Sequence, residues 1–214
     1  MSDHRPTIVH IIDELSTGGA QTHLLTVIKS ALKSHRVNHV VVCLFGEGNL
    51  LSEFEQLGCQ VKIFDFRDKL KKHQFTLITT ELSQFLNPDQ HDIVECHLTW
   101  SRIFGSKAAK LAGIDQCYGY EHGDLYLNSM HIRWLNFISQ FRFNKIFVCS
   151  HAMEKIFRRR NLILRNKTTV LHNCIDPNKH PHANDSAEKR HETFKFCCVG
   201  TLGRGVNKRV DVII

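Results

Sequence analysis

Short apolar runs alternate along residues 1–173 with longer segments in which apolar residues recur every three or four positions. A run of four to eight apolar residues is typical of a buried strand, and the wider spacing is typical of an amphipathic helix. The runs predict strands over residues 8–12, 39–45, 61–66, 92–97, 116–122, 145–150 and 168–173. The spaced segments predict helices over residues 20–32, 50–57, 75–86, 101–112, 129–143 and 151–162.

Strands that alternate with helices indicate βαβ units and a parallel sheet. The predicted strands are apolar on both faces, as expected of a sheet that helices cover on each side. We therefore predict an α/β domain over residues 1–173, with a doubly wound, mostly parallel, Rossmann-like sheet.

The composition changes after this domain. Residues 174–192 are polar and contain Pro177 and Pro181, which predicts a linker. Residues 193–214 open with another apolar run and end in a helix-like pattern. A strand and part of a helix cannot bury a core of their own. This end of the chain is therefore either the truncated start of a second domain or an appendage of the first.

A glycine pair, Gly18-Gly19, separates the first predicted strand from the first predicted helix. A strand, a glycine turn and a helix direct free backbone N–H groups and a helix dipole at an anion. The absence of a side chain lets a phosphate approach the backbone closely. The G-x-G-x-x-G dinucleotide motif is absent, and a plain tight turn is the alternative interpretation.

Further polar residues follow other predicted strands, namely His97, His122, Ser150 and Asn173. Ligands of a doubly wound sheet bind at the carboxyl ends of its strands. These positions and the glycine pair therefore predict one ligand-binding cleft.

The formal net charge of +7 favours anionic partners such as nucleotide sugars or membrane surfaces. Solubility alone also explains excess Lys and Arg. No nucleic-acid-binding motif is present, so we expect no nucleic-acid partner. We expect a cytoplasmic protein, because there is no signal-peptide pattern and no apolar run long enough to span a membrane. Eight cysteines suggest a reducing compartment, and five of them lie in or beside apolar runs and read as buried thiols, namely Cys43, Cys96, Cys117, Cys149 and Cys197.

Fifteen histidines raise the question of a metal site, but no Cys/His pair has zinc-site spacing, so we expect no metal. Arg158, Arg159 and Arg160 form a basic, partly amphipathic helix with nearby apolar residues. Such a helix can lie on an anionic membrane, here the inner face. A solvated helix face is the alternative interpretation.

The order of several short motifs resembles that of the GT-B glycosyltransferases, specifically the retaining family 4 type. The motifs lie at residues 16–21, 57–61, 92–97, 111–113, 120–123, 148–153, 172–176 and 199–211. Together they cover nearly the whole chain. The resemblance implies transfer of a sugar, with retention, from a nucleotide-diphosphate donor to a saccharide or lipid-linked acceptor, as in polysaccharide biosynthesis. It implies no cofactor besides the nucleotide sugar that serves as substrate.

The resemblance also implies roles for individual residues. Gly18 and Gly19 would bind the donor phosphate through backbone N–H groups, and Arg204 and Lys208 would stabilise the departing diphosphate. His122 matches the active-site histidine of the family, and a structural histidine bonded to a backbone carbonyl is the alternative. The residues expected on the acceptor side are His97, Glu121, Asp124, Ser150 and Asn173. Trp134 could stack on a sugar, although core packing is commoner for aromatic residues.

The chain departs from the family pattern at several positions. Glu95 replaces the first histidine of a His-x-His motif, Cys174 replaces a glycine, and Thr201 replaces an arginine. No Glu-x7-Glu motif of the second domain is present. We therefore keep a second hypothesis, that the chain is a non-catalytic binding or regulatory subunit, or a remnant, which needs a donor-binding partner chain. A third is a nucleotide-binding α/β protein with another substrate.

Overall fold

The computed structural model describes residues 5–123 and 129–175. Its centre is a seven-stranded sheet in the order β3-β2-β1-β4-β5-β6-β7, and every neighbouring pair is parallel. The strands are β1 (Thr7–Ile12), β2 (Asn38–Cys43), β3 (Gln60–Ile63), β4 (Ile93–His97), β5 (Gln116–Glu121), β6 (Lys145–Val148) and β7 (Thr168–Val170). The predicted α/β class and doubly wound, parallel sheet are confirmed.

Helices connect the strands, and most of them match a predicted helix. They are α1 (Gly19–Leu32), α2 (Leu51–Gln56), α3 (Arg67–Lys71), α4 (Phe75–Phe85), α5 (Thr99–Ala112), α6 (Met130–Gln140), α7 (His151–Arg160) and the 3-10 helix η2 (Leu162–Lys167). The short helix α3 was not predicted, because five residues are too few to show a helical period.

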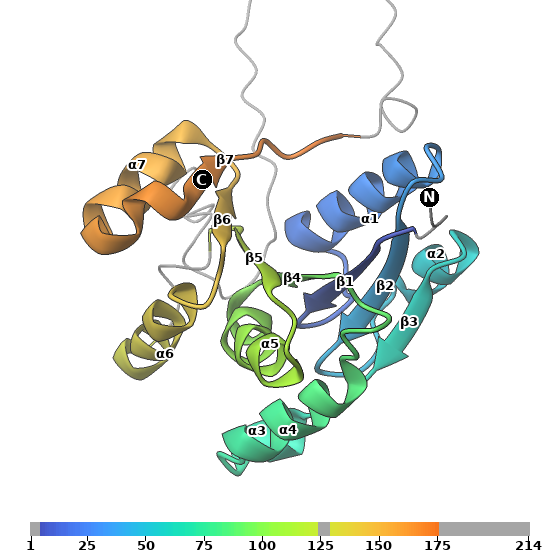
Figure 1. Cartoon of the computed structure of the whole chain (residues 1–214), viewed down its shortest axis with the longest axis horizontal. Helices are drawn as coiled ribbons and strands as arrows, with labels where there is room; N and C mark the ends of the chain where they lie inside the picture. Colours follow the sequence, from blue (N-terminus) through green and yellow to red (C-terminus); the bar gives the residue numbers. More distant parts are fainter. Residues whose placement is uncertain (1–4, 124–128, 176–214) are drawn as a thin grey trace, which may run out of the picture. The chain divides into compact units, whose positions relative to one another are not determined.

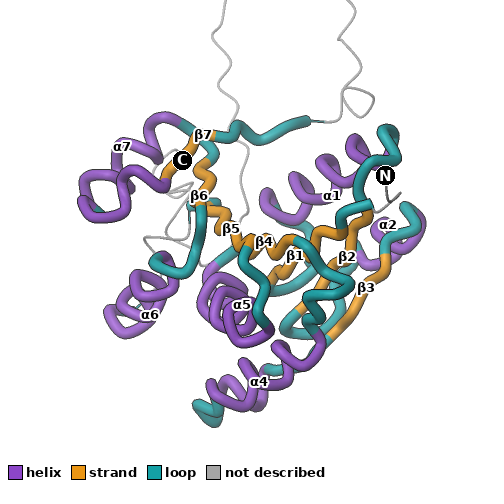
Figure 2. The backbone as a smooth tube through the Cα atoms, in the orientation of Figure 1, coloured by secondary structure: helices purple, strands orange, loops and turns teal. Residues whose placement is uncertain are grey.

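Two hydrophobic clusters lie on opposite faces of the sheet. The cluster beneath α1 and α2 contains Ile12, Leu24, Ile28 and Phe54. The cluster on the other face holds residues of α4, α5 and α7, among them Ile78, Phe104 and Phe157. Figures 1 and 2 show α1 and α2 separated by the strands from α4 and α5. The sheet is therefore covered on both sides, which explains why its strands are apolar on both faces.

The strand order reverses between β1 and β4. β1 leads through α1 to β2 on one side, and β4 leads through α5 to β5 on the other. Connections of this kind leave a crevice outside the carboxyl ends of the two central strands, where ligands of such sheets bind. In the register of β1 and β4, His10 stands opposite Glu95 and Ile12 stands opposite His97.

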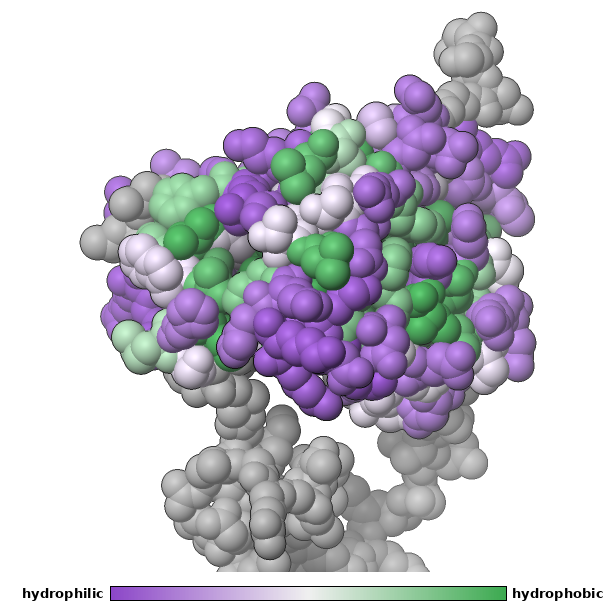
Figure 3. Space-filling model, turned by 90° about the horizontal axis from the view of Figure 1, so that it is seen from below, coloured by the Kyte–Doolittle hydropathy of each residue, from purple (hydrophilic) through white to green (hydrophobic). Residues whose placement is uncertain are grey.

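On the face of the molecule drawn in Figure 3, hydrophilic side chains predominate and hydrophobic ones form separate patches. Within the described part of the chain, no helix is both long and apolar enough to cross a membrane. The chain divides into two units after Asp176. The predicted linker, apart from Cys174 and Ile175, and the predicted second domain lie outside the described residues. These boundaries stay a prediction.

Candidate functional site

The carboxyl edge of the sheet collects most of the residues that the sequence singled out. Gly18 and Gly19 follow β1, and His97 is the last residue of β4. His122 comes directly after β5, and Ser150 lies between β6 and α7. Because all seven strands are parallel, these positions share one edge of the sheet. Asn173 follows β7 at the same edge and is exposed.

The first turn of α1 has no side-chain cap. Gly18 is the N-cap residue in an extended conformation, and no acidic residue lies in the first turn. A Cβ atom added at Gly19 would meet nothing within 4 Å, whereas one added at Gly18 would meet Gln21 Oε1 at 2.6 Å. The space beside Gly19 is therefore open, and the uncapped start of α1 suits an external anion.

Two other helices that begin at this edge are already capped. The Asp13 carboxylate, just after β1, accepts hydrogen bonds from the backbone N–H of Trp100 (3.2 Å) and of Ser101 (2.7 Å) at the start of α5. Ser150 Oγ accepts a hydrogen bond from the Met153 N–H (3.2 Å) and so caps α7. This capping role explains why a serine stands at position 150. Its predicted acceptor-side role stays a prediction.

Several imidazole rings lie together on the α1 face of the sheet. His10 Nε2 lies 3.0 Å from His39 Nδ1, and His97 Nδ1 lies 3.4 Å from His122 Nε2. The ring centroid of His23, one turn after Gly19, is 6.0 Å from that of His122. His23 thus connects the start of α1 with the histidine expected at the active site.

The rings of His97 and His122 are neutral near pH 7. Burial, with a smaller contribution from His23 and Arg102, lowers the pKa of His122 to about 3. Burial also lowers the pKa of His97 well below its usual value, and the neighbouring His122 and His10 act in the same direction. A neutral imidazole has one donor and one acceptor nitrogen, so His122 can exchange hydrogen bonds with a hydroxyl group.

Glu121 lies on the opposite face of the sheet from His97 and His122. Its carboxylate is fully buried and forms an ion pair with Arg102 of α5, which is 1% exposed. Glu121 Oε1 also accepts a hydrogen bond from the Gly123 N–H (3.0 Å). This geometry fixes the backbone on both sides of His122. It supports a positioning role, and the predicted contact with an acceptor stays a prediction.

Leu98 connects β4 to α5 with a left-handed backbone, φ +70°. Such a conformation is rare for a branched residue and costs free energy. Arg102 Nε donates a hydrogen bond to the Leu98 carbonyl (3.0 Å), and so does the Arg102 N–H (3.3 Å). Arg102 therefore holds the strained turn directly after His97. Sequence reasoning missed Arg102 because its ion-pair partner, Glu121, lies on a separate strand.

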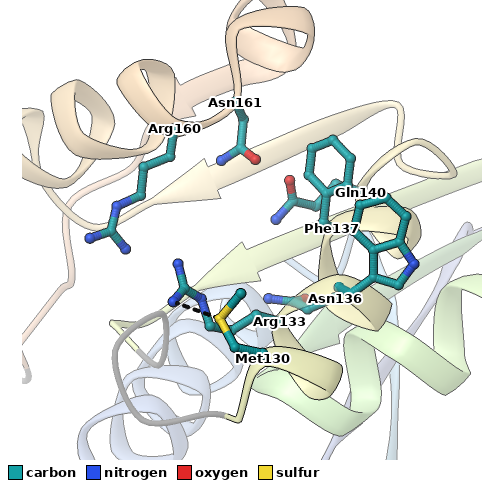
Figure 4. A pocket seen from close by; sticks show the side chains of 8 residues that line it. Met130, Arg133, Asn136, Phe137, Gln140, Arg160 and Asn161 are labelled. Atoms are coloured by element: carbon teal, nitrogen blue, oxygen red, sulfur yellow. Dashed lines mark hydrogen bonds between the residues drawn. The ribbon is translucent and has the colours of Figure 1, made fainter.

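A cavity of about 440 Å³ lies between α6 and α7 (Figure 4). The guanidinium groups of Arg133 and Arg160 extend toward one another in the figure. The lining residues combine aromatic, amide and cationic groups, and they are Met130, Arg133, Trp134, Asn136, Phe137, Gln140, Arg160 and Asn161. Trp134 is 61% exposed, so its ring is available to a ligand.

A sequence model of Glycosyltransferase Family 4 matches residues 17–179. The chain belongs to glycosyltransferase family 4. The match includes the glycine turn before α1, the ends of β4 and β5, and α7. A comparison with curated protein sequences found no match.

Solved structures share the fold. Anabaena HepE in complex with UDP has a TM-score of 0.64 and 19% identity, over 80% of this chain and 45% of that one. The lipopolysaccharide outer core galactosyltransferase WaaB has a TM-score of 0.62 and 19% identity, over 79% and 46% of the two chains. A Rickettsia africae glycosyltransferase has a TM-score of 0.60 and 16% identity, over 87% and 48%. The chain spans about half the length of these structures, and the likeness shows the GT-B fold of a family 4 N-terminal domain.

Three residues expected at the site of this family 4 domain lie outside the described part of the chain. They are Asp124, Arg204 and Lys208, and their roles stay predictions. Arg158, Arg159 and Arg160 are exposed on α7, where Arg158 forms an ion pair with Glu154 (2.8 Å). His10, which was given no site role, and Glu95, which was considered near the acceptor side, lie beside His97 in the imidazole cluster.

Proposed function

We propose that this domain is the acceptor-side half of a retaining glycosyltransferase. In this proposal a nucleotide-diphosphate sugar lies along the carboxyl edge of the sheet, and its sugar passes to a saccharide or lipid-linked acceptor. The observation that carries the proposal is the position of His23. His23 lies in the first turns of α1 and contacts His122, so the uncapped start of α1 lies beside His122. His122 follows β5, which is two strands away from β1 in the sheet.

The donor diphosphate is received by the backbone N–H groups at Gly18 and Gly19. The positive end of the α1 dipole and the open space at Gly19 support this placement. A diphosphate leaving group gains negative charge as the bond to the sugar breaks, so fixed amide dipoles stabilise the transition state more than the ground state. Arg204 and Lys208 supply positive charge to the same group.

His122 contacts the transferred sugar or the acceptor hydroxyl. Its neutral ring orients a hydroxyl through a hydrogen bond without placing a second charge near the donor. Glu121 and Arg102 act through the backbone around His122 and hold the ring at the cleft.

The acceptor side extends to the cavity between α6 and α7. Trp134 and Phe137 offer surfaces on which a sugar ring or a lipid chain can pack, and Arg133 and Arg160 offer charge to a phosphate. The exposed Arg158 and Arg159 on α7 add positive charge beside it. This combination suits an acceptor presented at an anionic membrane surface.

A second candidate is a non-catalytic binding subunit that works with a donor-binding partner chain. It is favoured by the departures from the family pattern at Glu95 and Cys174. It shares the binding groups described above and differs only in where the donor nucleoside is held.

The test is donor binding and sugar transfer with a panel of radiolabelled nucleotide sugars, on the full 214-residue chain. We expect binding of at least one donor, and loss of transfer in His122→Ala with donor binding retained. Transfer that appears only after a second, donor-binding polypeptide is added favours the binding subunit. Absence of binding to every donor, both with and without the second polypeptide, overturns both candidates.

A further inference from the structure

The α1 face of the sheet carries a cluster of possible metal ligands where the two central strands meet. His10 lies on β1, and Glu95 and His97 lie on β4. One side-chain donor atom of each residue lies within 4.8 Å of the others. His10 Nδ1 is 3.0 Å from Glu95 Oε2, and His97 Nε2 is 3.9 Å from the same oxygen. Sequence analysis did not predict the cluster, because His10 and Glu95 lie far apart along the chain.

The two histidine nitrogens that face Glu95 are buried and lack a hydrogen bond. His10 and His97 are each 1% exposed, and neither His10 Nδ1 nor His97 Nε2 has a hydrogen-bond partner among the described residues. His10 Nδ1 therefore lies close to the Glu95 carboxylate but forms no hydrogen bond with it. A buried polar atom left unpaired costs free energy, so two such nitrogens beside one carboxylate call for a ligand.

The opposite nitrogen of each ring is held by another histidine. His10 Nε2 meets His39 Nδ1 at 3.0 Å, and His97 Nδ1 meets His122 Nε2 at 3.4 Å. Metal-bound histidines generally donate their second N–H to a neighbouring acceptor, which fixes the tautomer and the ring orientation. In that tautomer the inner nitrogens are unprotonated and their lone pairs are directed toward Glu95.

We propose that His10, Glu95 and His97 bind a divalent transition-metal ion, best matched by Zn²⁺. Two imidazoles and one carboxylate are ligands that Zn²⁺ accepts, with a fourth position left for water. Bonds of about 2.0–2.1 Å in tetrahedral geometry place donor atoms roughly 3.3 Å apart, so small side-chain shifts close the cluster around the ion. The side chain of Glu95 is 18% exposed and gives the ion a route from solvent.

The bound ion joins β1 to β4 across the point where the strand order reverses. It also fixes the ring of His97, which in turn contacts His122. The site therefore goes beyond the proposed sugar transfer, and its test does not involve the donor. Its first effect is on the stability of the domain, because an ion that binds only the folded state raises the melting temperature.

The experiment measures binding of ZnCl₂ to tag-free, EDTA-treated chain by calorimetry and by metal analysis after dialysis. The background carries His180→Ala and His182→Ala, because the His-Pro-His sequence at residues 180–182 could bind zinc by itself. We expect one equivalent of zinc, an increase in melting temperature with Zn²⁺, and none with Mg²⁺. Equal responses to both ions overturn the proposal.

The variant Glu95→Gln keeps the shape of the side chain and removes its charge, and Glu55→Gln on the exposed part of α2 is the matched control. We expect zinc affinity to fall at least tenfold in Glu95→Gln and to stay unchanged in Glu55→Gln. Unchanged affinity in Glu95→Gln overturns the proposal.

Co²⁺ bound to the unmodified chain provides a second measurement that needs no variant. We expect d–d absorption of a four-coordinate nitrogen and oxygen site. Thiolate charge-transfer absorption overturns the proposal, since it would place the ion at a sulfur ligand such as Cys174, whose Sγ lies 3.5 Å from His23 Nδ1.

Discussion

The guanidinium of Arg102 and the carboxylate of Glu121 form an ion pair that is 1% and 0% exposed. Arg102 holds the turn after β4 through the Leu98 carbonyl, and Glu121 holds the turn after β5 through the Gly123 N–H. One buried ion pair therefore fixes two turns. The first is the turn after β4, which follows His97, and the second is the turn after β5, which contains His122. The positions of both imidazoles at the cleft depend on this ion pair.

Removing one member of this pair destabilises the domain. Arg102→Met leaves the Glu121 carboxylate buried without its charge partner, which costs about 3–5 kcal/mol in the free energy of unfolding. Urea denaturation measures the change. The double variant Arg102→Met/Glu121→Leu is the control, and we expect it to recover most of the loss because it leaves no buried charge. A single variant as stable as the unmodified chain contradicts this role.

A side chain at Gly19 obstructs the donor phosphate without disturbing the fold. A Cβ atom there meets nothing within 4 Å, so we expect Gly19→Val to change the free energy of unfolding by less than about 1 kcal/mol. We expect donor affinity to fall at least tenfold, because the methyl groups occupy the position of a phosphate oxygen. Ser30→Val, exposed near the other end of α1, is the matched control. Isothermal titration calorimetry with the nucleotide sugar that binds measures the donor affinity of each variant. Equal donor affinities in Gly19→Val and Ser30→Val refute the phosphate contact.

Stability falls at high pH because of a buried thiol. Burial raises the pKa of Cys43 from its usual 9 to about 11. Between these values the folded state keeps the proton that the unfolded state releases, so the free energy of unfolding falls as pH rises, and the full contribution is present below pH 9. The expected loss is about 2–3 kcal/mol at most. It is measured as the pH dependence of the difference between the unmodified chain and Cys43→Ala. A difference that stays constant across this range contradicts the assignment.

Vesicles test the expected membrane contact of α7. We expect the chain to sediment with anionic phospholipid vesicles more than with neutral ones, and to be released by salt. Replacing Arg158 and Arg159 by Gln removes two exposed charges, and at roughly 1 kcal/mol per charge the affinity falls tenfold or more. The same replacement at Lys71 and Lys72 of the α3 region changes the charge equally and is the control. Equal losses of vesicle affinity in both variants would show that the net charge of the chain, and not its position on α7, determines the binding.

The sequence predicted the sheet well because its strands are apolar on both faces and each is followed by a turn. The apolar run from Ile8 to Ile12 predicted a strand, and the apolar residues spaced every three or four positions after Gly19 predicted a helix. Neither prediction needed information on long-range contacts. Strand ends were less certain. The predicted strand over 145–150 ends at Val148, because Ser150 caps α7 instead of continuing the strand. A capping hydroxyl and a strand residue look alike in a single sequence.

The polar interior could not be predicted in the same way. The side-chain period along β5 places Glu121 on the opposite face from Tyr120, yet nothing local identifies Arg102 as its partner. The same holds for His10 and Glu95, which become neighbours only through the pairing of β1 with β4. Such contacts depend on the order of strands in the sheet, which hydrophobic patterns do not encode.

The central claim is that a nucleotide sugar binds between the start of α1 and His122. The most direct measurement is ¹H–¹⁵N NMR of the chain titrated with the bound donor, with the Gly18 and Gly19 amides and the His122 ring assigned. The account predicts saturating shifts at these three positions and much smaller shifts at the Gly58 and Gly113 amides, which lie at the other edge of the sheet. Donor-dependent shifts confined to the cavity between α6 and α7, with Gly19 and His122 unmoved, would contradict it.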